Sequence, residues 1–215
     1  MFIAIPVSSE GGKDSPGYYM LNVAYSRYVA NAGYTPVLVT MEHDIIEIAN
    51  KCDGLLLPGG KDVDSIFYGE DNESSYNVDP VKDDLERRLF YAFAELGKPI
   101  FGICRGFQLI FLEYCRVNQK LTNARFLYTQ HIGNHNQSSS NLAARVTPTH
   151  MVSSMKYLLY NYEEKDLNGT LMPVNSMHHQ ACLIKIMADR SFEITRHFTL
   201  LSGTVRGADS YKNYV

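Results

Sequence analysis

Short apolar runs alternate with longer amphipathic segments through the first half of the chain. The longer segments repeat their apolar side chains at helical spacing, most clearly at 80–96. The short runs carry apolar residues at nearly every position, as strands buried on both faces of a sheet do. The pattern predicts strands at 2–7, 36–40, 54–57 and 100–103, and helices at 18–32, 42–51, 80–96 and 107–114.

Strands that alternate with helices at this spacing predict βαβ units. An α/β fold with a doubly wound, mostly parallel sheet follows from that alternation. After a polar stretch at 131–141, short apolar runs at 182–187, 192–199 and 201–205 predict a meander of strands in a β-rich C-terminal third. With 215 residues and no internal repeat, we expect one domain over 1–215.

Composition and charge narrow the class of protein. The net charge of -3 is not gathered into blocks, so we expect no nucleic-acid or membrane partner. The N-terminus lacks a signal-peptide pattern, and no apolar run approaches the length of about 20 residues that a membrane span needs. The four cysteines show neither CxxC pairs nor zinc spacing. We therefore expect a cytoplasmic protein with free thiols.

One cysteine stands between two glycines where a predicted strand gives way to a predicted helix. The segment reads FGICRGF, with Gly102 and Gly106 two residues to either side of Cys104. A sharp strand–turn–helix elbow needs small residues at both positions. The helix N-terminus favours an anion, and Arg105 adds a positive charge, so we predict that Cys104 is a nucleophile that readily forms a thiolate. The alternative is a buried strand-end cysteine whose neighbouring glycines only permit packing.

Three ordered segments resemble those of a known family. GICRGFQ at 102–108 is similar to the nucleophile elbow of class I glutamine amidotransferases, and within them to that of the γ-glutamyl hydrolase branch, peptidase family C26. LLPGGKDV at 56–63, followed by YGE at 68–70, resembles the PGG segment of that branch. VNSMHHQ at 174–180 resembles its segment with the catalytic histidine. The resemblance spans the whole chain and implies a flavodoxin-like fold.

The same match implies the site residues. His178 takes the place of the general base that a cysteine nucleophile needs, with His179 beside it and Gln108 as a supporting residue. A tetrahedral intermediate also needs backbone donors aimed at its oxyanion. We expect these from the amide of Arg105 and from the turn at 59–60, where Gly59 and Gly60 let the backbone approach a ligand closely. The alternatives are a plain tight turn and a structural histidine.

The chain departs from the family at several points. In the family an acidic residue follows the histidine and orients it, but Glu193 and Asp209 are the only acidic residues after Asp189, and neither has the family's context. A truncated or processed chain, an acid supplied by a second polypeptide, and a two-residue dyad are all open interpretations. Lys82 stands where the family's RD-x-x-E helix start has arginine. The Gly-Gly pair that normally follows the elbow is missing.

The leading hypothesis is a hydrolase of γ-glutamyl amides or of glutamine that works through a γ-glutamyl thioester, without metal or organic cofactor. If the chain instead delivers ammonia, the acceptor enzyme must be a separate partner. A second hypothesis is a non-catalytic binding or assembly protein on the same fold, which the missing acid favours. A third is a thiol peptidase or chaperone of a related cysteine-elbow family. The identity of the amine, the pathway and the oligomeric state are left open by the sequence.

Overall fold

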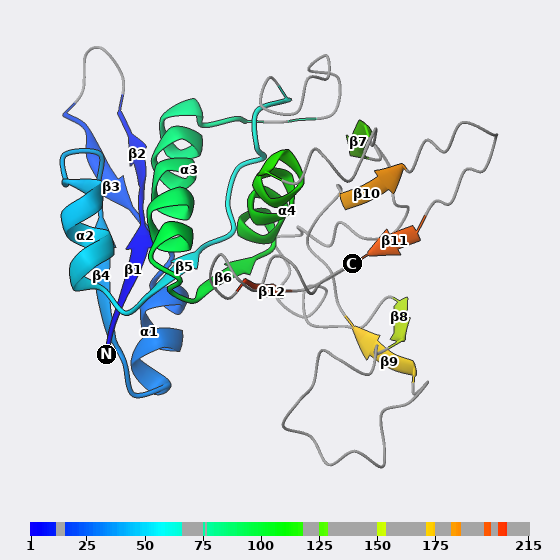
Figure 1. Cartoon of the computed structure of the whole chain (residues 1–215), viewed down its shortest axis with the longest axis horizontal. Helices are drawn as coiled ribbons and strands as arrows, with labels where there is room; N and C mark the ends of the chain where they lie inside the picture. Colours follow the sequence, from blue (N-terminus) through cyan, green and yellow to red (C-terminus); the bar gives the residue numbers. More distant parts are fainter. Residues whose placement is uncertain are drawn as a thin grey trace. The chain divides into compact units, whose positions relative to one another are not determined.

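The computed structural model divides the chain into two compact units. One unit comprises Met1–Leu127 and Cys182–Val215, and the other comprises Tyr128–Ala181. The structure describes residues 1–11, 16–65, 75 and 77–117, and the strands at 125–128, 150–153, 171–174, 182–185, 196–198 and 202–205 (Figure 1).

A five-stranded sheet forms the centre of the first unit. Its order is β4-β1-β5-β6-β12; four strands run parallel, and β12 is antiparallel to β6 at the edge. The strands are β1 (Phe2–Pro6), β4 (Thr35–Val39), β5 (Gly54–Leu57), β6 (Ile100–Ile103) and β12 (Ser202–Val205). The order 2-1-3-4 of the parallel strands is that of a flavodoxin-like, doubly wound sheet. The predicted α/β fold is therefore confirmed.

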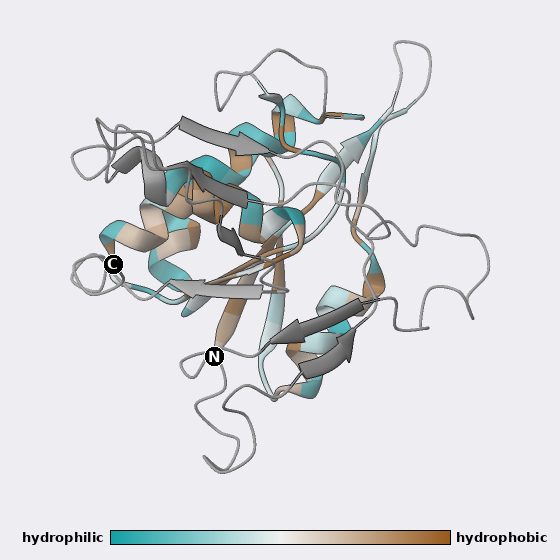
Figure 2. Cartoon of the chain, turned by 90° about the vertical axis from the view of Figure 1, so that its right-hand side faces the viewer, coloured by the Kyte–Doolittle hydropathy of each residue, from teal (hydrophilic) through white to brown (hydrophobic). Residues whose placement is uncertain are grey.

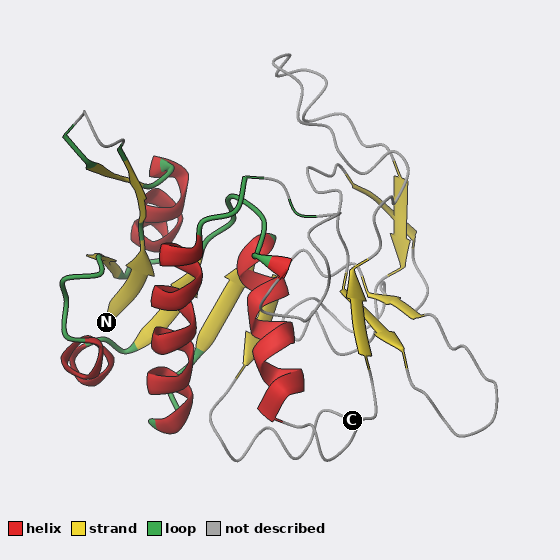
Figure 3. Ribbon diagram, turned by 90° about the horizontal axis from the view of Figure 1, so that it is seen from above, coloured by secondary structure: helices red, strands yellow, loops and turns green. Residues whose placement is uncertain are grey.

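Helices cover both faces of this sheet. Seen from above, α1 lies on one face, while α2, α3 and α4 lie on the other (Figure 3). The helices are α1 (Val23–Asn31), α2 (Ile45–Lys51), α3 (Pro80–Glu95) and α4 (Arg105–Val117). Polar N-caps fix where three of them begin: side-chain oxygens of Asn22, Asp44 and Asp79 accept from the first free amides of α1, α2 and α3.

Alternate side chains of the central strands pack against the two helix layers. Ile5 and Leu56 point to the α1 face, where they form a cluster with Val29. On the other face α3 buries an apolar stripe. Its members are Leu85, Leu89, Phe90 and Phe93, at most 1% exposed. Strands covered on both faces carry hydrophobic residues throughout, whereas the helices alternate in character along their length (Figure 2). Because these strands are buried on both faces, the short apolar runs in the sequence predicted them.

The structure differs from the sequence-based expectation at two places. The predicted helix at 18–32 is a strand, β3 (Tyr18–Met20), followed by α1; β3 pairs with β2 (Ser8–Glu10) as an antiparallel ribbon. Asn22 separates the two elements because its side chain caps the Ala24 amide at 2.9 Å. The last strand of the predicted meander, β12, pairs instead with β6 in the central sheet.

The remaining strands belong to smaller sheets. β7 (Arg125–Tyr128), β10 (Cys182–Lys185) and β11 (Arg196–Phe198) form one sheet, in which β10 and β11 are antiparallel. In the second unit, β8 (His150–Ser153) pairs antiparallel with β9 (Leu171–Val174). The polar stretch at 131–141 lies outside the described residues. Among those described, no helix combines the length and apolar character that a membrane crossing requires.

Candidate active site

Cys104 sits on a strained turn between β6 and α4. Its φ of 52° lies in the left-handed region, one of two such values among the described non-glycine residues. β6 ends at Ile103 and α4 begins at Arg105, so Cys104 alone makes the turn. Left-handed backbone at a side-chain-bearing residue costs about 1–3 kcal/mol and concentrates at functional sites. The thiol is partly exposed at the carboxyl end of the parallel strands, where such sheets bind ligands.

The two flanking glycines are required by close backbone approach. A Cβ on Gly102 would lie 2.5 Å from the amide nitrogen of Phe107, in the first turn of α4. A Cβ on Gly106 would lie 2.1 Å from the carbonyl oxygen of Leu57, on the neighbouring strand β5. Both distances are far below van der Waals contact with backbone atoms that cannot rotate away. The prediction that the elbow needs small residues at both positions is confirmed.

Gly106→Ala is therefore expected to distort the elbow and to destabilise the fold. Overpacking of this kind costs about 1–3 kcal/mol, and the rigid backbone contact places this substitution at the upper end. Urea unfolding of the two proteins measures the difference. Gly17→Ala is the matched control, because its added Cβ meets only the Glu10 carbonyl oxygen at 3.7 Å, an ordinary contact. Equal loss of stability in the two variants would contradict the packing explanation.

A tyrosine from α1 reaches the same turn, although no sequence motif pointed to it. The backbone N–H of Gly59, directly after β5, donates to the hydroxyl of Tyr25 at 2.9 Å. The space beside Gly59 is narrow, because an added Cβ would lie 2.7 Å from that hydroxyl and 3.4 Å from the Cβ of Cys104. Tyr25, Gly59 and Cys104 therefore meet at one point. An aromatic residue on an otherwise ordinary helix face gave no signal for this role.

Tyr25→Phe is expected to lower the free energy of unfolding, because it leaves the Gly59 amide without its acceptor. An unsatisfied buried donor costs about 1–3 kcal/mol. Chemical denaturation gives the difference directly. Tyr28→Phe on the same helix is the control, since Tyr28 is 56% exposed and its ring stacks on Phe101 whether or not it carries a hydroxyl. A Tyr25→Phe protein as stable as Tyr28→Phe would show that the Gly59 hydrogen bond contributes nothing.

The Gly59 hydrogen bond separates the roles of the two turn glycines. With the Gly59 amide committed to Tyr25, Gly60 carries the other amide of the turn. No hydrogen bond from the Gly60 N–H occurs among the residues that the structure describes. Gly60 has a φ of 158°, at the limit of the range where glycine is favoured. Of the two, Gly60 is the better placed to donate to a ligand.

The environment of the thiol acts on the pKa of Cys104 in both directions. Burial raises the pKa of Cys104 above its ordinary value, and nearby Asp62 raises it further, whereas the backbone N–H and the guanidinium of Arg105 lower it. The helix N-terminus and Arg105 therefore do not outweigh desolvation. Among the described groups, desolvation opposes the predicted thiolate, which stays a prediction. A protonated resting thiol makes a general base more important.

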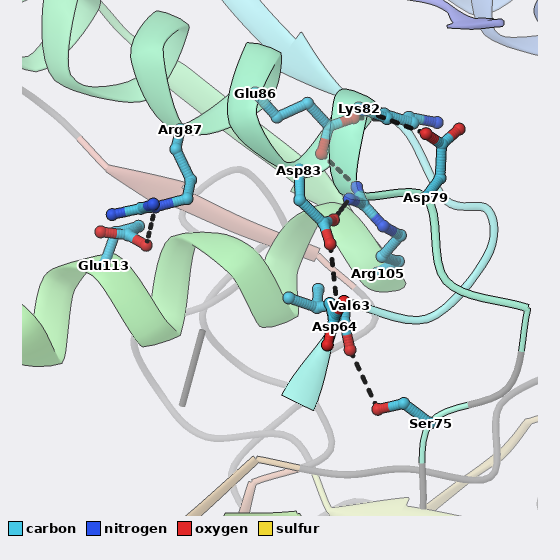
Figure 4. Close-up of polar contacts among 10 residues, drawn as sticks. All are labelled: Val63, Asp64, Ser75, Asp79, Lys82, Asp83, Glu86, Arg87, Arg105 and Glu113. Carbon is cyan, nitrogen blue, oxygen red and sulfur yellow. Dashed lines mark hydrogen bonds and ion pairs between the residues drawn. The ribbon is translucent and has the colours of Figure 1, made fainter. Parts of the chain in front are cut away.

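The Arg105 side chain points toward α3, into a buried ionic cluster (Figure 4). Arg105 is 1% exposed, and its guanidinium donates one branch to Asp83 and the other to Glu86, both on α3. The two carboxylates on α3 thus compensate the positive charge of Arg105. Asp83 and Glu86 stand at the acidic positions of a segment that resembles the family's RD-x-x-E. That resemblance was the only sequence signal for these two residues. Among the described residues, no three His, Cys, Asp or Glu side chains gather as metal ligands would.

The other expected site residues divide between described and undescribed segments. Gln108 is buried in the first turn of α4, where its backbone N–H donates to the Cys104 carbonyl oxygen at 3.2 Å. His178 and His179 lie outside the described residues, as do Glu193 and Asp209. The structure therefore brings together the turn of Gly59 and Gly60, Cys104 and Arg105. The base and its orienting acid stay predictions.

The fold and the turn together define a flavodoxin-like α/β domain with a cysteine elbow, and comparisons with known proteins agree. The family model "Peptidase C26" matches residues 3–196. The chain is 31% identical over 157 residues to the glutamine amidotransferase-like protein YvdE of Lactococcus lactis subsp. lactis, covering 69% of this chain and 59% of that protein. It is 28% identical over 176 residues to the γ-glutamyl-γ-aminobutyrate hydrolase of Escherichia coli O157:H7, covering 76% and 64%.

The chain belongs to the peptidase C26 family, because the family model covers most of its length. A homologue of YvdE in Lactococcus lactis subsp. cremoris is 33% identical over 137 residues, which are 62% of that protein. The matched region thus spans about three fifths of the length of these relatives, between 59% and 64%.

Proposed function

We propose that this chain hydrolyses γ-glutamyl amides, or glutamine itself, through a γ-glutamyl thioester on Cys104. The observation that carries the proposal is the strained turn at Cys104, which holds a partly exposed cysteine beside its neighbour's backbone amide and the Gly59 turn, at the end of the sheet. The name of the Escherichia coli relative, a γ-glutamyl-γ-aminobutyrate hydrolase, supports this substrate class. No part of the proposal requires a metal or an organic cofactor.

The first half of the reaction forms the thioester. The thiol is protonated at rest because burial raises the pKa of Cys104, so His178 accepts the proton as the sulfur attacks the γ-carbonyl carbon. The oxyanion that develops accepts hydrogen bonds from the amides of Arg105 and Gly60. Such donors act mainly on the transition state, and the loss of one typically costs about 10²–10³-fold in kcat. His178 then returns the proton to the leaving amine.

The second half releases glutamate. Water takes the position of the departed amine, His178 accepts a proton from it, and the oxygen attacks the thioester carbonyl. The same two amides hold the second oxyanion. Collapse of that intermediate breaks the carbon–sulfur bond, and the proton on His178 restores the thiol. The products are glutamate and a free amine, or ammonia when the substrate is glutamine.

A small substrate panel tests the proposal. Glutamine, γ-glutamyl-γ-aminobutyrate and γ-glutamyl p-nitroanilide are each incubated with the protein, and glutamate release is measured. The affinity label 6-diazo-5-oxo-norleucine should add one adduct, on Cys104 and not on Cys52, which is 2% exposed. If the whole panel stays intact and no adduct forms, the chain is a non-catalytic binding protein. The preferred member of the panel identifies the amine.

A further inference from the structure

A single buried carboxylate on α3 stands between two buried cations of the site. Glu86 is fully buried, and its Oε2 accepts from the Arg105 guanidinium. Its Oε1 lies 3.8 Å from the ammonium nitrogen of Lys82, whose side chain is 4% exposed. That distance is an ion pair without a hydrogen bond, so Glu86 faces one cation with each oxygen. One cation belongs to the residue that follows Cys104, and the other lies beside Gly60.

The first cation fixes the backbone that follows the nucleophile. Arg105 is the first residue of α4, and its own amide lies close enough to the sulfur to lower the pKa of Cys104. Its guanidinium is gripped on two branches, by Glu86 and by Asp83. A planar fork held on both branches has one orientation. The side chain of Arg105 therefore determines where its amide, the first proposed oxyanion donor, is held.

The second cation lies beneath the Gly59-Gly60 turn. A Cβ placed on Gly60 would be 3.2 Å from the Lys82 ammonium nitrogen, which thus occupies the space beside that residue. Burial lowers the pKa of Lys82, and the carboxylate of Glu86 opposes this effect most strongly. The ion pair with Glu86 thereby favours the charged form of Lys82 and holds its side chain in place. The position of Gly60, the second proposed donor, depends on it.

Asp83 adds a second connection between the same segments. One of its oxygens accepts from Arg105, and the other accepts from the backbone N–H of Asp64 at 2.9 Å, just beyond the turn (Figure 4). α3 thus holds both α4 and the segment after β5 through charged groups. We infer that Glu86 and Lys82 are positioning residues that set the spacing between the Arg105 and Gly60 amides; this inference rests on the proposed function.

The energetics favour a positioning role over a stabilising one. Buried ion pairs seldom stabilise a fold more than well-packed apolar residues would, because desolvation offsets their attraction. Here the cluster also leaves Glu86 Oε1 and Arg105 Nε without hydrogen bonds among the described residues. An apolar cluster cannot fix the orientation of the segments that it joins, because its contacts have no preferred direction. The ionic cluster fixes the orientation of two segments that must present amides to one oxygen atom.

The experiment compares Glu86→Gln and Lys82→Met with the unmodified chain on γ-glutamyl p-nitroanilide. Each variant keeps the shape of the side chain and removes its charge. We expect kcat to fall about 10- to 100-fold with KM changed less than about threefold, because the oxyanion exists only in the transition state. Lys82→Arg, which keeps the charge, should recover most of the loss. Asp84→Asn is the control, since Asp84 lies on the same helix but is about half exposed.

A second readout separates positioning from collapse of the elbow. Iodoacetamide alkylates Cys104 without forming an oxyanion, so its rate should stay within about twofold in both variants. Unchanged kcat in both variants overturns the inference while the proposed function stands, and so does alkylation that falls in step with kcat. If Glu86→Gln does not fold, Lys82→Met decides, since Glu86 keeps its hydrogen bond to Arg105. An unmodified chain that releases no product overturns the proposed function and this inference together.

Discussion

Cys104→Ala is expected to reduce the turnover of γ-glutamyl amides by about 10⁴-fold or more, since loss of a covalent nucleophile has effects of this size in other hydrolases. The residue forms the bond on which the proposed mechanism depends. Cys52 cannot replace it, because Cys52 is buried with a raised pKa. Glutamate release and the diazo-oxo-norleucine adduct should disappear together. Cys52→Ala is the control and should keep both.

The stability of two inactive variants gives an independent check of the strained turn. Both Cys104→Ala and Cys104→Gly remove the nucleophile, but only glycine adopts a φ of 52° without steric cost. Cys104→Gly should therefore unfold at higher urea concentration than Cys104→Ala, by about 1 kcal/mol in free energy. A turn that had evolved for packing alone would have no reason to keep this cost. Equal stability of the two variants would show that the turn is not strained in solution.

The sequence predicted the central sheet because its strands are buried on both faces. β1, β5 and β6 read as continuous apolar runs, and the observed bounds agree with the predicted ones within a residue. The ribbon of β2 and β3 was missed because Tyr18, Tyr19 and Met20 resemble the start of an apolar helix. Local pattern does not distinguish an exposed β-ribbon from a helix turn. Only the Asn22 cap marks the boundary.

The site was predictable where a motif fixes backbone geometry, and less so where side chains meet from distant elements. The need for the two elbow glycines could be predicted from the sequence, because a strand-to-helix turn has no room for a Cβ. Tyr25 lies 34 residues before its partner Gly59, and no local pattern connects them. The effect of burial on the pKa of the thiol was not predictable for a related reason. The helix N-terminus is visible in the sequence, whereas the burial that outweighs it comes from the tertiary packing.

His178→Ala is expected to lower kcat/KM at neutral pH by about 10³–10⁴-fold, and to change the pH profile as well. A catalytic base contributes about 10²–10⁴-fold, and the raised pKa of Cys104 makes the contribution of the base larger near pH 7. With His178 present, the rate should rise with pH through about 6.5, where a histidine becomes neutral and able to accept a proton. Without it, the thiol must ionise unaided.

The residual activity of His178→Ala should therefore rise only at higher pH, above the ordinary cysteine pKa of about 8.5, because burial raises the pKa of Cys104 and cannot lower it. His179→Ala is the matched control: it removes the neighbouring imidazole and should cost less than about tenfold without moving the profile. The rate of glutamate release between pH 5 and pH 10 distinguishes the two. If His179→Ala shows the larger loss and the shifted profile, the assignment of the base is reversed. If neither variant shifts it, the proton of the Cys104 thiol goes to some other group.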